Sequence, residues 1–350
     1  MLSSLILSCQ QEEIEEPRDP SLFTENFQTR GNSRSALPAQ AGSPGRNLKE
    51  VVLAPLENAE CGATEFSDLL WKELTLLATD QLAVDHLELY QNLNYFAAVF
   101  GIGGEYFGGE GEYTHLIQKV KRDLEQFWDM PGEIRIHGQH THTLNDPEAL
   151  VEILWRLKAD VASKEELYEQ VEFYLQVNQL STQLPESPFF AIDAFATTKD
   201  LIVLGDGLVA LFSGTGIDQE VVWTSILAHE WAHQIQINFF DSWYSEDAFE
   251  TEPEKARLLE LEADFFAAYY LTHKRGATYN WKRVNDFLEV FYQAGDCSFD
   301  FEYHHGTPAQ RQKAAYAGYL LTQEMQRKGH ILSAEEVHLQ FLMALPRILG

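Results

Sequence analysis

Basic residues are scarce in this 350-residue sequence: 25 Lys and Arg stand against 54 Asp and Glu, which gives a formal net charge of −29. Such an excess of negative charge would repel a phosphate backbone, so the composition excludes a typical nucleic-acid-binding protein. It also disfavours an anionic membrane surface as a partner. The charge therefore removes classes of partner without indicating any particular reaction.

Cysteine is also rare, and its spacing excludes two kinds of site. The three cysteines, Cys9, Cys61 and Cys297, form no CxxC pair, which argues against a cysteine zinc cage and a thioredoxin-type redox site. Cys61 and Cys297 could form one disulfide in an oxidising compartment, but their separation in sequence says nothing about proximity. Two buried free thiols are the simpler interpretation, because unpaired cysteines commonly pack as small apolar side chains.

Long apolar runs are missing, so the sequence predicts no transmembrane helix, which needs about 18 or more such residues. The first nine residues, MLSSLILSC, resemble the end of a bacterial lipoprotein signal, with the small Ser8 directly before Cys9. The apolar run at 2–7 is short for such a signal, and no Lys or Arg precedes it. We predict a lipid anchor at Cys9 and a cell-envelope location (lipoprotein, periplasmic or secreted), with the cytoplasm as the alternative.

The remaining composition divides the chain into successive parts. Residues 1–9 would be a signal remnant, and residues 10–48 are polar, acidic and poor in apolar anchors, which predicts a disordered linker. Helical apolar spacing predicts a mainly helical part of unknown role at 49–188. Residues 189–350 form the part that carries the motifs described below.

The hydrophobic periodicity predicts an α+β fold that is mainly helical, with a small mixed sheet beside the helix at residues 219–236. Alternating and β-branched residues predict the strands, which are expected at 133–138, 189–195 and 200–212. Apolar residues at helical spacing predict the earlier helices, which are expected at 66–100, 113–128, 146–161 and 163–180.

The stretch ILAHEWAHQIQ, residues 226–236, carries a possible metal centre. His229 and His233 stand four residues apart, so on a helix both imidazoles leave the same face and can bind one Zn²⁺. Glu230 follows His229 directly and lies close enough to hold a water without binding the metal. The competing interpretation is a helix that happens to carry two histidines.

A catalytic zinc needs a third protein ligand and an open fourth position. The helical segment at 257–271 offers two glutamates, of which Glu260 shares a face with Asp264 and with small alanines that permit close helix packing. Glu262 points to the opposite side, among large apolar residues, which favours ordinary packing. We predict Glu260 as the third ligand of one zinc ion, and Asp264 as the carboxylate that orients a ligand histidine.

HExxH followed by a helical ExxAD resembles the gluzincin class of zinc peptidases. Residues 189–236 are similar to the CAAX-prenyl-protease type, although Asp193 replaces its Asn. The segments HEWAHQIQ, ELEAD and HHGTPAQRQ are more similar to the bacterial putative neutral zinc metallopeptidase family, with Ala232 in place of Gly and Glu262 in place of Gln. The late segment at 304–312 and the lack of membrane spans favour the second family. The resemblance covers roughly residues 189–320.

This resemblance implies a zincin-like metallopeptidase core at 189–350 and a zinc-dependent peptidase that acts on a peptide or protein substrate. Glu230 would be the general base, and a donor would stabilise the oxyanion. His305, which aligns with the family's HGT segment, is our first choice for this donor, with Tyr303 and Arg311 as rivals. A turn that leads into a helix near Pro308 is the alternative interpretation of this segment.

Two other stretches carry weaker expectations. The strand at 200–212 could offer an edge on which an extended peptide pairs. The histidines of HGQHTHT, residues 137–143, could bind a metal adventitiously, but we expect a solvent-exposed loop. As an alternative function, the chain could be a zinc-binding pseudo-peptidase that acts as a binding or assembly protein in the cell envelope. The intact Glu230 counts against that alternative.

Overall fold

The computed structural model describes residues 61–158, 161–245, 249–297, 304–325 and 330–350. The described helices are α2 (Glu65–Leu77), α3 (Gln81–Asp85), α4 (Leu87–Phe100), α5 (Thr114–Phe127), α6 (Pro147–Leu157), α7 (Tyr168–Leu180), α8 (Asp206–Gly214), α9 (Gln219–Trp243), α10 (Glu252–Thr272), α11 (Trp281–Gln293), α12 (Pro308–Met325) and α13 (Ala334–Leu349). The short 3₁₀ turns are η2 (Thr141–Asn145), η3 (Lys164–Leu167) and η4 (Pro188–Ala191), and the strands are β1 (Arg135–Gln139), β2 (Ala194–Thr197) and β3 (Leu201–Gly205). The predicted signal, lipid anchor and linker lie outside the described residues.

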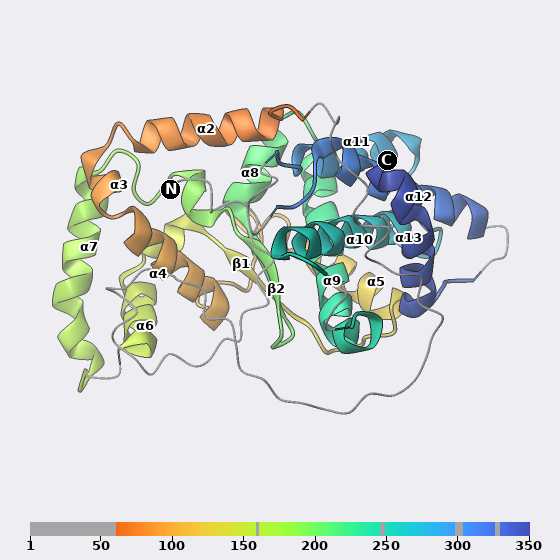
Figure 1. The fold of residues 1–350 in the computed structure, drawn as a ribbon. Helices are drawn as coiled ribbons and strands as arrows, with labels where there is room; N and C mark the ends of the chain where they lie inside the picture. The colour runs from red at the N-terminus through yellow and green to blue at the C-terminus, as the bar shows by residue number, and fades with distance from the viewer. Residues whose placement is uncertain (1–60, 159–160, 246–248, 298–303, 326–329) are drawn as a thin grey trace.

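The predicted α+β architecture is confirmed: helices dominate, and one small mixed sheet lies among them (Figure 1). The sheet separates α3, α4, α6 and α7 from the group α9 to α13 (Figure 1). Its strand order is β1-β3-β2, with β1 parallel and β2 antiparallel to β3. Because β3 is paired on both sides, the expectation that it offers a free edge to a peptide is wrong.

Two predicted strands are shorter than expected. The segment 189–195 begins as the turn η4, because the Ser187 side chain accepts a hydrogen bond from the Phe189 amide and Pro188 follows it. The segment 200–212 changes after Gly205 into α8, so this helix, and not the one with the HExxH motif, comes first after the strands. The first turn of α8 approaches η4 so closely that position 207 must be glycine. A Cβ at Gly207 would lie 1.9 Å from the carbonyl oxygen of Pro188.

The predicted helices in the N-terminal part are confirmed in kind, with different limits. The long segment at 66–100 is divided into α2, α3 and α4, because the Asp80 side chain accepts hydrogen bonds from the first amides of α3 and starts a new helix. The helix α6 begins as predicted, with Asp146 as N-cap and Pro147 in its first turn. The helix predicted from Ser163 begins with the turn η3 before α7.

The helices α9 and α10 form the framework on which the HExxH motif is placed. Helix α9 begins where the Asp218 side chain accepts a hydrogen bond from the Val221 amide, as predicted. It contacts β2, β3 and α10, and its residues 221–236 are all buried. Helix α10 is capped by Thr251 and contacts α9 and α12 extensively. Both helices are therefore surrounded by protein along much of their length.

Close contact between α10 and α12 depends on Gly318 in α12. A Cβ at this position would lie 2.2 Å from the carbonyl oxygen of Phe265 in α10. We expect Gly318→Ala to lower the free energy of unfolding by about 1–3 kcal/mol, because overpacking forces the helices apart. Chemical denaturation would measure the change against Gly109→Ala, whose Cβ would meet nothing within 4 Å. Equal stability of the two variants would contradict the close contact.

The structure bears on two further expectations from the sequence. In the parts of the chain that are described, no helix is long and apolar enough to cross a membrane. Strand β1, which precedes residue 189, pairs with β3, which follows it. The division of the chain into parts at residue 189 stays a prediction, but the sheet is built from both sides of that boundary.

Candidate metal centre

Three side chains from α9 and α10 form one buried, metal-capable group. His229 and His233 come from α9 and Glu260 from α10, and one ligand atom from each lies within 4.8 Å of the others. The two Nε2 atoms are 3.0 Å apart, and the Glu260 carboxylate lies 3.3 Å from His229 and 3.6 Å from His233. Among the described residues, this is the one group of His, Cys, Asp and Glu with metal-binding spacing.

The donor set of this group suits one zinc ion. Two imidazole nitrogens and one carboxylate are ligands that zinc commonly takes in catalytic sites, where a fourth position stays open. The three residues are at most 5% exposed, so a positive ion there would compensate a buried carboxylate. The choice of Glu260 over Glu262 for this group agrees with the geometry.

The pKa values of His229 and His233 are shifted in opposite directions. Burial acts to lower the pKa of His229, but contacts with Asp264 and Glu260 outweigh it and raise the pKa to about 9. Burial, and next the charge of His229, lower the pKa of His233 to about 4. At neutral pH the metal-free pair therefore carries one positive charge on His229, and zinc binding would release a proton.

Glu230 is a buried carboxyl group without a partner. It is 0% exposed, and neither of its oxygens has a hydrogen bond to any described residue. Burial raises its pKa to about 8. A carboxyl group with so strongly shifted a pKa, beside a metal-capable group, is a candidate functional residue.

Asp264 and Arg311 form a buried ion pair next to the metal-capable group. Oδ1 of Asp264 lies 2.9 Å from Nδ1 of His229, on the far side of the ring from Glu260. The guanidinium group of Arg311 in α12 donates two hydrogen bonds of 2.8 Å to Asp264, and its Nη2 lies 3.1 Å from Glu260. Although burial opposes it, the charge of Arg311 holds the pKa of Glu260 well below its usual range.

This contact of Arg311 was not predicted from the sequence. Arg311 was expected there only as an alternative to His305 as oxyanion donor. Helical spacing shows that Arg311 lies in the first turn of α12, but not that α12 packs against α10. The position that the sequence predicts for Asp264, next to a ligand histidine, agrees with the structure.

The expectation that Glu262 takes part only in ordinary packing is wrong. It is 0% exposed, and its carboxylate accepts hydrogen bonds from Gln236, Tyr244 and His338. Large aromatic residues do surround it, as its helix face predicts, but polar groups from α9 and α13 reach it between them. The helical wheel located the face of Glu262 correctly and missed what the other helices bring to that face.

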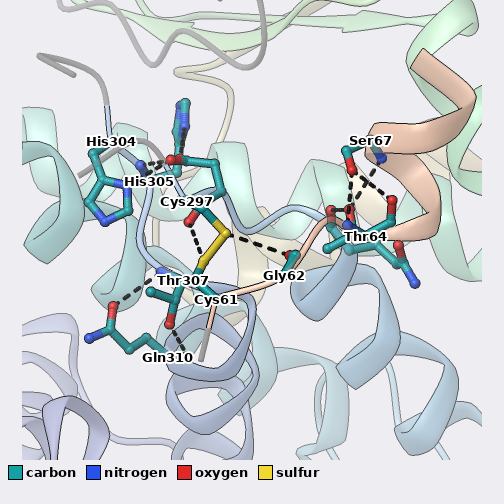
Figure 2. Close-up of a disulfide and its surroundings, with 11 residues drawn as sticks. Cys61, Gly62, Thr64, Ser67, Cys297, His304, His305, Thr307 and Gln310 are labelled. Atoms are coloured by element: carbon teal, nitrogen blue, oxygen red, sulfur yellow. Dashed lines mark hydrogen bonds and ion pairs between the residues drawn. A yellow bond between two sulfur atoms is a disulfide. The ribbon is translucent and has the colours of Figure 1, made fainter. Parts of the chain in front are cut away.

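His305 lies in a second polar cluster, which is held by Asp296 (Figure 2). Its backbone amide donates to Asp296 Oδ2 at 2.8 Å, and its Nδ1 lies 3.1 Å from the same oxygen. His304 reaches the other carboxylate oxygen at 2.7 Å. His305 is also one of the groups that lower the pKa of Glu260. His305 is thus in electrostatic range of the metal-capable group, whereas its rival Tyr303 lies outside the described residues.

A disulfide joins Cys61 and Cys297, so the interpretation as two free thiols is wrong (Figure 2). The two cysteines meet because the start of α2 packs against the end of α11, where Thr64 donates a hydrogen bond to the Gln293 carbonyl oxygen. The bridge lies directly beside Asp296, which holds His304 and His305. Disulfides of this kind are typical of oxidising compartments.

The histidine stretch at 137–143 is not the exposed loop that we expected. Only His142 is exposed, whereas His140 is 1% exposed and its Nδ1 lies 2.5 Å from the Asp206 carboxylate. The ring of His140 stacks on Tyr106 at a centroid distance of 4.1 Å. Asp206 arrives from the start of α8, 66 residues later, which sequence proximity could not show.

Comparisons with models of protein families, with curated proteins and with solved structures find no match. The similarity to gluzincins therefore rests on the motif residues of this chain and on their geometry. The structure brings together His229, Glu230, His233, Glu260 and Asp264, which the sequence proposed as one site. It establishes a buried group that could hold one metal ion, within a mainly helical fold.

Proposed function

We propose that this protein is a zinc-dependent peptidase of the gluzincin type, which hydrolyses peptide bonds with Glu230 as general base. The observation that carries the proposal is the buried group of His229, His233 and Glu260 beside the unpartnered carboxyl of Glu230. The family closest in motif is the bacterial putative neutral zinc metallopeptidases, which is a resemblance in sequence only.

The chain's own residues would divide the chemistry among them. Zinc, held by His229, His233 and Glu260, would supply Lewis-acid chemistry that acidifies water and polarises a carbonyl oxygen. Glu230 would accept the proton of the attacking water at its carboxylate and pass it to the departing amine. Burial raises the pKa of Glu230, which makes its ionised carboxylate a stronger proton acceptor.

Two further residues support this reaction. Asp264 would fix the orientation of His229 through its carboxylate, whose Oδ1 lies 2.9 Å from Nδ1, so that Nε2 faces Glu260. His305 would stabilise the negative charge that develops on the carbonyl oxygen, and Asp296 holds it in place. Arg311 is a weaker candidate for that donor, because its guanidinium group already binds two carboxylates.

Zinc content tests the proposed ligand set. We expect the full chain, purified under metal-replete conditions, to hold one zinc ion per molecule, and Glu260→Gln to lose it. An amide is a poor zinc ligand, and the change removes the negative charge that offsets the metal. Glu252→Gln, at an exposed site in the first turn of the same helix, is the matched control and should bind zinc as the native chain does.

The outcomes of this experiment separate the interpretations. Absence of zinc from the native chain would overturn the peptidase proposal, and zinc retained by Glu260→Gln would move the third ligand elsewhere. Zinc binding without cleavage of any peptide in a broad substrate mixture would favour the alternative, a zinc-binding pseudo-peptidase that acts in assembly. The deep burial of the ligands is compatible with that alternative, but the unpartnered Glu230 favours catalysis.

We also propose a location in the bacterial cell envelope. The Cys61–Cys297 disulfide is of the kind that persists in oxidising compartments. The similarity of the first nine residues to a lipoprotein signal points the same way, with a lipid anchor at Cys9. The substrate would then be a peptide or protein of that compartment.

A further inference from the structure

Glu262 is a buried carboxylate that the peptidase chemistry described above does not use. Its Oε2 accepts hydrogen bonds from Gln236 Nε2 at 2.9 Å and from the Tyr244 hydroxyl at 2.5 Å. Its Oε1 accepts one from His338 Nδ1 at 2.5 Å. Three donors from two other helices and the residue after α9 thus converge on one side chain that is 0% exposed. Such a convergence fixes the position of the carboxylate.

Gln236 connects this carboxylate to a proposed metal ligand. Its Oε1 lies 2.7 Å from Nδ1 of His233, and its Nε2 donates both to Glu262 and, at 2.8 Å, to the carbonyl oxygen of Leu259. Because the amide nitrogen already faces two acceptors, the amide oxygen must face His233. The only hydrogen bond that this arrangement allows is one from Nδ1–H of His233 to Gln236. Nε2 of His233 is then left with its lone pair toward Glu260.

Tyr244 and His338 lie at the opposite end of this series of hydrogen bonds from His233. Burial, and next the charge of Glu262, raise the pKa of Tyr244 well above its usual range, so its hydroxyl group stays a donor. The ring of His338 stacks on Trp243 at a centroid distance of 4.3 Å, which fixes the direction of Nδ1. The hydrogen bonds of both side chains run to Glu262, through which they can act on the metal-capable group.

We propose that Glu262 is a positioning residue for zinc, which acts through Gln236 to fix the tautomer and raise the basicity of His233. The proposal rests on the proposed zinc site of His229, His233 and Glu260. It gives the two histidines equivalent support from one helix: Asp264 contacts His229 directly, and Glu262 reaches His233 through one amide. Groups that hydrogen-bond to ligand histidines in this way commonly contribute strongly to metal affinity.

The first test is the zinc affinity of Glu262→Gln, measured by competition with a chelator. We expect affinity to fall by about 10–100-fold, because an uncharged amide polarises Gln236 less and offers fewer acceptor sites. In the cobalt-substituted protein, the visible absorption bands should shift, because they report the ligand field of His233. Tyr269→Phe is the matched control: it removes a buried hydroxyl of α10 that accepts from the Leu332 amide, about two helical turns from Glu262.

A double-mutant cycle shows whether Glu262 acts through Gln236. Gln236→Ala should itself weaken zinc binding, and adding Glu262→Gln to it should cause little further loss, because the connection is already broken. A purely structural role of Glu262 would instead multiply the two effects.

His338→Leu should weaken zinc binding, while His338→Asn, whose amide nitrogen can replace Nδ1 as donor, should restore most of it.

The outcomes distinguish this inference from the peptidase proposal. If the native chain binds zinc and Glu262→Gln binds it equally well with an unchanged cobalt spectrum, the inference fails alone. Multiplicative losses in the cycle would also overturn it. If the native chain binds no zinc, both proposals fail together. Should Glu262→Gln not fold, the Gln236→Ala and His338 variants test the same connection from its other positions.

Discussion

The Glu230→Gln variant should retain one zinc ion per chain and lose about 10²–10⁴-fold of its peptidase activity. Glutamine has nearly the shape of glutamate, but its amide cannot accept the proton of an attacking water. Since neither oxygen of Glu230 has a partner among the described residues, the substitution breaks no hydrogen bond there. The loss should therefore appear in kcat, with zinc content unchanged.

Hydrolysis of a peptide mixture, followed by mass spectrometry, measures this loss. Glu220→Gln provides the matched control, because Glu220 lies exposed in the first turn of the same helix. It should cleave the mixture at the native rate. If Glu230→Gln also cleaves at the native rate, Glu230 is not the base.

The same variant has a second, independent signature in stability. In the folded metal-free protein, burial raises the pKa of Glu230 to about 8, above the ordinary value of 4.5 that applies to the unfolded chain. The unfolded state therefore binds fewer protons between these values, and the native protein loses stability as pH rises from about 4.5 to 8. We expect metal-free Glu230→Gln to be more stable than the native chain at pH 8, with the difference vanishing near pH 4.5. Denaturation at both pH values would measure it.

The metal-capable group was predictable because it depends mainly on helix geometry. The spacing of His229 and His233 places both on one face, and the spacing of Glu260 and Asp264 does the same in α10. One rule therefore selects both pairs without knowledge of the fold. The structure adds that these two faces meet, which places Glu260 within 3.6 Å of both rings.

The errors at Glu262 and His140 have a common physical origin. Each was judged by the residues around it in sequence, whereas its partner arrives from far along the chain: His338 lies 76 residues from Glu262, and Asp206 lies 66 residues from His140. A helix that is buried around its whole circumference has no solvent face, so a charge on its second face must also find a partner. Periodicity predicts which residues share a face, but not what covers that face.

The strand predicted at 200–212 was too long for a different reason. Its apolar residues run from Leu201 to Phe212 with only Gly205, Asp206 and Gly207 between them, and the two apolar parts fit a buried strand and a buried helix equally. The change occurs after Gly205, where Asp206 enters the first turn of α8. An acidic residue is favourable there, because it faces the positive end of the helix dipole. That short signal identifies the boundary in retrospect.

Arg311→Met should have the largest effect on the stability of the metal-free protein, with a loss of about 3–5 kcal/mol in the free energy of unfolding. The guanidinium group of Arg311 is 2% exposed and binds the carboxylates of Asp264 and Glu260, both of them buried. Methionine fills much of the volume but leaves the two buried carboxylates without the guanidinium charge that stabilises both of them. Urea denaturation of the metal-free variant would measure the loss.

Arg311→Lys is the control that separates charge from geometry. Lysine keeps the positive charge but cannot donate the two parallel hydrogen bonds that Arg311 makes to Asp264, so it should lose less stability than methionine. Zinc should reduce the deficit of Arg311→Met, because a divalent cation held by Glu260 replaces the missing positive charge and binds only the folded state. If Arg311→Met were as stable as the native chain without metal, the two carboxylates would not depend on Arg311. If zinc left its deficit unchanged, the metal would not bind next to Glu260.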